Sequence, residues 1–140
     1  MPSLPPEDLL EAARSALRQA YAPYSGFRVG AAIRTASGGI FAGCNVENVS
    51  YPVSLCAERG AIAAAILAGE REITEVLIVS DSPDPCPPCG MCRQALWEFG
   101  PDLLVHLVGR DGDSRTLSLR TLLPEAFGPS SLDGFPGGRS

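Results

Sequence analysis

The sequence predicts an α/β fold of three layers, in which helices cover both faces of a mixed five-stranded sheet. Three segments carry apolar residues at helical spacing, and five shorter segments have the apolar or alternating pattern of strands. Their order along the chain is helix, strand, strand, helix, strand, helix, strand, strand. Helices that alternate with apolar strands pack on both faces of one sheet, and the first two strands are expected to be antiparallel.

The first helix is predicted to run from Pro5 and Pro6 to about Tyr21. Proline suits a first helical turn, where its missing N–H costs nothing. Pro23 lies just beyond the predicted end. The apolar residues that share helical spacing are Leu9, Leu10, Ala13, Ala16, Leu17 and Ala20.

Two strands, at residues 27–35 and 40–45, are predicted to form a hairpin, because a Ser-Gly-Gly turn signal lies between them. A polar and aromatic loop follows and ends at Leu55. The second helix, at residues 57–68, is rich in Ala, Ile and Leu, so we expect it to be buried on most of its faces.

The third strand, at residues 73–80, is continuously apolar, as in strands that are covered on both faces. A proline-rich loop over residues 81–88 leads to the third helix, at 89–99. A further apolar strand is predicted at 103–109. A short strand at 114–118 follows, and we expect a helical turn after it.

Length and charge limit the possible functions. The 140 residues suffice for one domain, which we place at residues 1–127; Gly, Pro and Ser dominate residues 128–140, which we expect to form a loose tail. The net charge of −5 and the lack of lysine give no attraction to nucleic acids or anionic membranes. No apolar segment is long enough to cross a bilayer. The N-terminal residues lack a signal-peptide pattern, so we expect a cytoplasmic protein whose five cysteines are thiols.

Three cysteines and one carboxylate fall at the starts of two predicted helices. Cys56 and Glu58 open the second helix, and Cys89 and Cys92 open the third. The partial positive charge of a helix N-terminus favours thiolates, and three thiolates suit zinc. A site with three protein ligands keeps a position for water, as catalytic zinc sites do. Both segments follow strands, so we expect them at one edge of the sheet, where ligand sites of open α/β sheets lie.

Two neighbouring residues have suitable chemistry for such a site. Three thiolates and zinc sum to a charge of −1, which weakens the metal as a Lewis acid. Arg59, one helical turn from Cys56, is placed to hydrogen-bond a thiolate and offset that charge. Glu58 is close enough to touch a zinc-bound water and to transfer its proton.

These motifs resemble those of the zinc deaminases, and specifically of the small homotetrameric cytidine deaminases. The resemblance rests on Cys56-Ala57-Glu58 followed by Pro88-Cys89-Gly90-Met91-Cys92-Arg93-Gln94. It covers most of the chain, because residues 27–32, 43–48 and 122–127 also resemble that family. A Cys-x-x-Cys pair alone is a weak signal; the segment with Asn45 and Glu47 narrows the resemblance to the branch that acts on free nucleosides. Cys56 stands where some zinc deaminases have histidine.

The resemblance implies a cytidine-deaminase-like fold, one Zn²⁺ per chain on Cys56, Cys89 and Cys92, and the hydrolysis of cytidine and 2′-deoxycytidine to the uridines and ammonia in pyrimidine salvage. Zinc-bound hydroxide would attack C4 of the base, with Glu58 as proton shuttle. The other roles it implies are ribose binding by Asn45 and Glu47, base contacts by Phe27 and by the backbone at Ala57 and Cys89, and entry of Tyr51 and Phe127 into a neighbouring subunit's site.

Structural roles are also compatible with each of these residues. Cys44 or Cys86 could supply a fourth thiolate to a structural zinc, and the spacing of Cys86, Cys89 and Cys92 matches part of an iron–sulfur motif. Glu58 also suits a helix N-terminus without catalysis. The residues for which an ordinary structural role would suffice are Arg59 in solvent, Asn45 and Glu47 in turns, and Phe27, Tyr51, Trp97, His106 and Phe127 in packing.

Three further functions fit parts of the pattern. A deaminase of nucleoside antibiotics would use the same zinc chemistry on a different substrate. A deaminase of RNA bases would too, although the acidic composition weighs against polynucleotides. A non-catalytic, zinc-stabilised binding module would need the cysteines but not Glu58.

Overall fold

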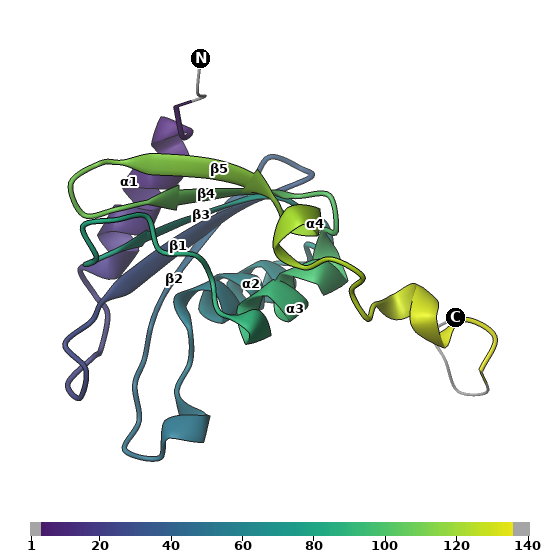
Figure 1. Ribbon diagram of the computed structural model, residues 1–140, viewed down its shortest axis with the longest axis horizontal. Helices are drawn as coiled ribbons and strands as arrows, with labels where there is room; N and C mark the ends of the chain where they lie inside the picture. Colours follow the sequence, from purple (N-terminus) through teal and green to yellow (C-terminus); the bar gives the residue numbers. More distant parts are fainter. Residues whose placement is uncertain (1–3, 136–140) are drawn as a thin grey trace.

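The protein is built on one five-stranded sheet with the strand order β2-β1-β3-β4-β5 (Figure 1). The structure is a computed structural model and describes residues 4–135. The strands are β1 (Val29–Thr35), β2 (Ile40–Cys44), β3 (Ile73–Ser80), β4 (Leu104–Val108) and β5 (Ser114–Ser118).

The sheet is mixed, as predicted. Strand β1 pairs antiparallel with both β2 and β3, so these two strands run in the same direction on either side of it. Strand β3 pairs parallel with β4, and β4 pairs antiparallel with the edge strand β5. Strands β2, β3 and β4 are therefore parallel to one another, and their carboxyl ends lie at the same edge of the sheet.

Helices cover both faces of the sheet, which confirms the three layers. Helix α1 (Glu7–Leu17) lies on one face, and α2 (Ala57–Leu67) and α3 (Gly90–Phe99) lie side by side on the other (Figure 1). Each face has its own core, centred on Leu9 and Leu77 beneath α1 and on Ala61 and Leu96 on the other face. Within residues 4–135, no helix has both the length and the apolar character that a membrane span requires.

The predicted end of the first helix is wrong: α1 ends at Leu17 and not near Tyr21. Long-range pairing is the reason. The Tyr21 amide donates to the Asn45 carbonyl at 3.0 Å, and the Glu47 amide donates to the Tyr21 carbonyl at 2.8 Å. These bonds draw residue 21 into an extended bridge with the segment that follows β2, which is incompatible with a helix.

The C-terminal part contains two short helices. Helix α4 (Leu119–Leu122) is capped by the Ser118 hydroxyl, which accepts from the Thr121 amide at 3.2 Å. A 3-10 helix, η2 (Pro129–Leu132), forms inside the segment expected to be loose, and it projects away from the sheet (Figure 1). Residues 136–140 of that segment lie outside the described residues. The domain boundary at residue 127 stays a prediction.

His106 is a buried structural residue, 4% exposed. Its Nε2 lies 2.8 Å from Glu75 Oε2, and its Nδ1 lies 3.0 Å from Thr116 Oγ1. Both ring nitrogens are therefore satisfied inside the sheet, as a structural role for this residue requires.

We predict that Leu77→Ala lowers the free energy of unfolding by about 2–5 kcal/mol, because Leu77 is fully buried between the sheet and α1. Leu67→Ala is the control: Leu67 is 91% exposed at the end of α2, and its truncation should change the value by no more than about 0.5 kcal/mol. Urea unfolding of both variants measures the difference. Equal effects would contradict the assignment of the core.

Candidate metal centre and active site

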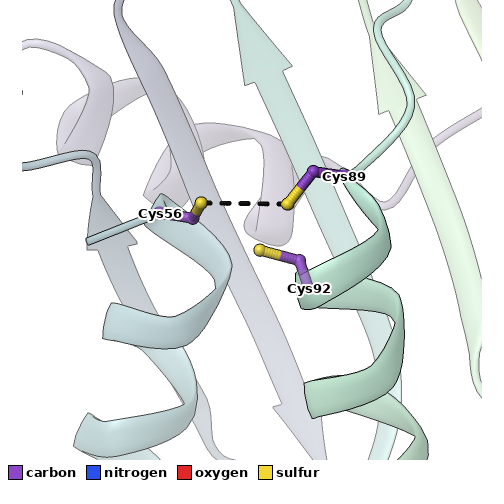
Figure 2. A group of neighbouring side chains, drawn as sticks. All are labelled: Cys56, Cys89 and Cys92. Atoms are coloured by element: carbon purple, nitrogen blue, oxygen red, sulfur yellow. Dashed lines mark hydrogen bonds between the residues drawn. The ribbon is translucent and has the colours of Figure 1, made fainter. Parts of the chain in front are cut away.

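Three thiols converge at the starts of α2 and α3 (Figure 2). Cys56 is the N-cap of α2, Cys89 is the N-cap of α3, and Cys92 lies in the first turn of α3. Their sulfur atoms all lie within 4.8 Å of one another, and the sulfurs of Cys56 and Cys89 are 3.9 Å apart. Zinc–thiolate bonds are about 2.3 Å long, so donors at this spacing can share one ion.

Hydrogen bonds in the preceding loops position Cys56 and Cys89. The loop before Cys56 is tied back by two backbone bonds between Val46 and Leu55, of 2.9 and 2.8 Å. The loop before Cys89 is held by Arg93, whose Nε donates to the Pro88 carbonyl at 2.8 Å. Nη1 of the same guanidinium donates to the Leu122 carbonyl at 2.8 Å. Arg93 therefore fixes the approach to a metal ligand, a role that its place in the sequence motif did not reveal.

The charges of the cluster favour a bound cation. A hydrogen bond from Cys92, aided by the Arg59 guanidinium, lowers the pKa of the Cys56 thiol to about 5 against the opposing effect of burial. The same hydrogen bond, together with burial, raises the pKa of the Cys92 thiol well above its usual range. The cluster alone therefore holds one thiolate readily but resists further ionisation. A soft divalent cation among the sulfurs removes that resistance, so the donor set fits zinc.

Arg59 lies between the three-cysteine cluster and the loop that precedes Cys56. Its Nη2 donates to the Ser54 carbonyl at 3.0 Å. The nearby Cys56 sulfur raises the pKa of the guanidinium, which therefore keeps its positive charge next to the thiolate. Within residues 4–135, its buried Nε has no hydrogen-bond partner. This geometry suits a counter-charge for the anionic cluster.

Glu58 lies in the first turn of α2, one position beyond Ala57, and is only 4% exposed. Burial is the main cause that raises the pKa of this carboxyl, and the negative charge at Cys56 adds to it. A carboxyl group with a raised pKa holds a proton more readily than an exposed one, and it can return that proton to a bound substrate.

Cys56, Cys89 and Glu58 border a cavity of about 290 Å³, close to the lower limit of about 300 Å³ typical of small-molecule pockets. Its lining contains these residues predicted from the sequence: Phe27, Asn45, Glu47, Cys56, Ala57, Glu58 and Cys89. It also contains Val29, Leu55 and Ile78, which the sequence pattern did not separate from the core, because apolar residues of strands and loops look alike whether they face a cavity or a helix.

Asn45 and Glu47 lie at the cavity and also hold the segment before β1. Asn45 accepts from the Val29 amide at 2.9 Å and donates to the Phe27 carbonyl at 2.8 Å. Glu47 accepts from the Tyr24 and Ser25 amides, at 3.0 and 3.1 Å, and from the Ser25 hydroxyl. The Ser25 hydroxyl is the main cause that lowers the pKa of Glu47, which keeps this carboxyl anionic. Each side chain retains hydrogen-bonding capacity for a ligand.

Tyr51 and Phe127 do not line the cavity of their own chain. Tyr51 is 72% exposed in the 3-10 helix η1 (Tyr51–Val53). Its ring packs edge-on against the ring of Tyr24, with the two ring centroids 6.5 Å apart. Phe127 is 63% exposed, and its carbonyl accepts from Gln94 Nε2 at 2.8 Å. Their expected roles require a second chain and stay predictions.

The remaining cysteines do not complete a four-thiolate site. All five cysteines are free. Among residues 4–135, the group that can hold a metal contains Cys56, Cys89 and Cys92 but neither Cys44 nor Cys86. Cys86 lies in the wall of the cavity. This arrangement favours a three-cysteine site open to the cavity over a closed structural zinc or an iron–sulfur cluster.

Comparison with known proteins identifies the family of this chain. The profile described as "Cytidine and deoxycytidylate deaminase zinc-binding region" matches residues 5–108. The chain belongs to this family. It is therefore an enzyme, and the resemblance predicted from the cysteine motifs is confirmed.

Individual relatives agree with the family. A cytidine deaminase of Halalkalibacterium halodurans is 42% identical over 120 residues, which cover 85% of this chain and 91% of the relative. One of Sporosarcina psychrophila is 40% identical over 127 residues, covering 90% and 93%. The solved structure of a cytidine deaminase from Burkholderia pseudomallei superposes with a TM-score of 0.84 at 46% identity, covering 89% of this chain and 100% of that one.

We predict that Cys89→Ala loses its zinc on dialysis against a chelator, because two thiolates and water hold the ion more weakly than three thiolates. Cys86→Ala, in which a neighbouring thiol is removed from the cavity wall, should keep its zinc. Metal analysis of the two dialysed variants checks the assignment. Loss of zinc from Cys86→Ala alone would assign the ligands differently.

Proposed function

We propose that this enzyme hydrolyses cytidine and 2′-deoxycytidine to uridine and 2′-deoxyuridine with release of ammonia, using one zinc ion per chain. The observation that carries the proposal is the position of Glu58, a buried carboxyl with a raised pKa that lies beside a three-cysteine cluster and lines a cavity of suitable size for a nucleoside. Relatives named cytidine deaminase support the substrate.

The cysteines and Glu58 divide the chemistry. Cys56, Cys89 and Cys92 hold the zinc, which when bound supplies the Lewis acid that activates the attacking water. Glu58 would take one proton of that water and deliver it to N3 of the pyrimidine as the oxygen adds to C4. It would then carry the proton of the new C4 hydroxyl to the amine, so that ammonia leaves and the C4 carbonyl forms. Its burial supports this role, because a carboxyl with a raised pKa holds a proton more readily than an exposed one and can pass it to a bound substrate. Arg59 balances the charge of the thiolates.

The cavity wall provides contacts for the rest of the nucleoside. Phe27 packs on the base, and backbone groups at Ala57 and Cys89 orient it. Asn45 and Glu47 bind the ribose hydroxyls. The anionic state of Glu47 supports this assignment, because a carboxylate accepts hydrogen bonds from hydroxyl groups. A sugar that lacks such a hydroxyl would leave part of this polar site unpaired, which disfavours it.

The composition and the site weigh against a polynucleotide deaminase and a binding module. The net charge of −5 argues against a polynucleotide substrate. A binding module without catalysis would not need the buried Glu58 carboxyl beside the three-cysteine cluster, because burying a carboxylate costs free energy of desolvation. A nucleoside antibiotic remains the second candidate substrate, because it would undergo the same zinc chemistry; only the ribose-binding segment with Asn45 and Glu47 argues against it. We place the reaction in cytoplasmic pyrimidine salvage.

The exposed aromatic residues support an assembly with shared active sites. Phe127 and Tyr51 are 63% and 72% exposed, so both aromatic rings are accessible to a second chain. We propose a homotetramer in which both residues reach a neighbouring chain's cavity and complete its wall.

The first experiment measures ammonia release from cytidine together with the zinc content of the same sample. Glu58→Gln should keep its zinc and its fold but lose about 10²–10⁴-fold in kcat, because an amide cannot transfer the proton. Glu11→Gln is the matched control, since Glu11 is exposed on α1 away from the cavity. A Glu58→Gln variant with normal turnover would refute the proposed mechanism.

A mixing experiment tests the assembly. Sedimentation should give a tetramer, and Phe127→Ala should lower kcat/KM for cytidine. Phe127→Ala supplies intact Glu58, and Glu58→Gln supplies intact Phe127, so co-assembled chains should be more active than either variant alone. A monomer, or a fully active Phe127→Ala variant, would contradict the shared site.

A further inference from the structure

The backbones of β2 and α2 approach each other closely at Gly43. A Cβ atom at this position of β2 would lie 2.5 Å from the Ala57 carbonyl oxygen, 2.5 Å from the Ala61 amide nitrogen and 2.9 Å from the Gly60 carbonyl carbon. All three are backbone atoms of α2, and a backbone cannot turn aside as a long side chain can. Any side chain at residue 43 must therefore push the beginning of α2 away from β2.

Space, and not backbone conformation, requires a glycine here. Gly43 is not among the residues with positive φ, and it pairs with Ala31 in the regular register of the β1–β2 ladder. Another residue could adopt this strand conformation without strain. The requirement arises only because α2 lies directly against the strand.

The contact lies between the two halves of the proposed active site. Gly43 precedes Asn45 by two residues, at the end of the strand that leads to the ribose-binding side. The atoms it meets on α2 begin at Ala57, between the metal ligand Cys56 and the proton carrier Glu58. Cys89 and Cys92 belong to α3 and do not share this contact. A shift of α2 away from β2 therefore moves one thiol and the carboxyl relative to the other two thiols and to Asn45.

We infer that Gly43 is a positioning residue that fixes the distance between the metal-binding and ribose-binding sides of the cavity. It acts through the backbone of α2 and touches neither metal nor substrate. The inference rests on the proposed cytidine deaminase function for its kinetic consequences, but its geometric consequence for the three thiols is independent of the substrate.

The test compares Gly43→Ala with two matched glycine variants. Gly60→Ala adds the same methyl group to the α2 side of the contact, where the nearest atoms are 3.6 to 3.8 Å away and the group fits. Gly30→Ala creates a comparable overlap on the opposite face of the sheet, with the Ala13 carbonyl oxygen at 2.1 Å and the Leu17 amide nitrogen at 2.7 Å. The helix displaced there is α1, which carries no residue of the site.

For the spectra, cobalt replaces zinc in one set of samples, because its visible absorption reports the geometry of the thiolate ligands. Zinc release and kinetics are measured on the zinc-loaded enzyme. Gly43→Ala should alter the cobalt–thiolate spectrum, release zinc to a chelator at least about 10-fold faster, and lose about 100-fold in kcat/KM for cytidine. Gly30→Ala should lower the melting temperature but leave the cobalt spectrum unchanged. Gly60→Ala should have the melting temperature and the spectrum of the unmodified enzyme. A folded Gly43→Ala variant with the original spectrum and zinc release would overturn the inference, as would identical spectral changes in Gly30→Ala.

A second variant decides the matter if Gly43→Ala does not fold. Gly60→Val extends side-chain atoms toward Gly43 Cα and the Cys44 carbonyl, which lie 3.7 and 3.8 Å from a Cβ at residue 60. It should change the spectrum and zinc release in the same direction as Gly43→Ala but less strongly, and unchanged values would overturn the inference. Failure of the unmodified enzyme to deaminate cytidine would refute the proposed function alone, because spectrum and zinc release still test Gly43.

Discussion

The candidate site depends on the close approach of the N-termini of α2 and α3. Cys56 is the N-cap of α2 and Cys89 is the N-cap of α3, and the sulfur atoms of these two cysteines are 3.9 Å apart (Figure 2). Three thiolates so close together would repel one another. The partial positive charges of two helix N-termini favour thiolates, and the Arg59 guanidinium helps to lower the pKa of the Cys56 thiol, so one thiolate is held before any metal binds. A zinc ion bound by the three sulfurs would supply the positive charge that favours ionisation of the others.

Sheet topology explains why the two helix starts meet. Strands β2, β3 and β4 are parallel to one another although β1 lies antiparallel between the first two. Helix α2 follows β2 and α3 follows β3, so both helices begin at the carboxyl edge of the sheet and both lie on the face opposite α1. Ligand sites of α/β sheets gather at this edge for the same reason. The fold therefore provides the place, and the cysteines provide the chemistry.

Local patterns predicted most of the elements and the metal motif, but they could not reveal contacts made over long distances. Strand 73–80 has the predicted bounds because its apolar pattern is continuous. Helix α1 ends early because Tyr21 pairs with residues far along the chain. Asn45 and Glu47 were predicted as ligand-binding residues, and their bonds to the backbone before β1 were not visible in the sequence. Gly128 lies against the Trp97 ring. The Gly-, Pro- and Ser-rich composition of residues 128–140 suggested a loose tail and gave no sign of this contact.

The two carboxyl groups of the cavity illustrate how position divides similar side chains between roles. Burial raises the pKa of Glu58, whereas hydrogen bonds from Ser25 and Tyr24 lower the pKa of Glu47. Environments that separate the pKa values of two neighbouring acids assign one to proton transfer and the other to permanent negative charge. In the proposed reaction, the acid that must gain and lose a proton is the buried one beside the metal. The acid that must only accept hydrogen bonds lies where the Ser25 hydroxyl, and then the backbone amides of Ser25 and Tyr24, keep it ionised. If Glu58 had the surroundings of Glu47, it would stay ionised and could not carry a proton. If Glu47 had the surroundings of Glu58, it would hold a proton and bind hydroxyl groups less well.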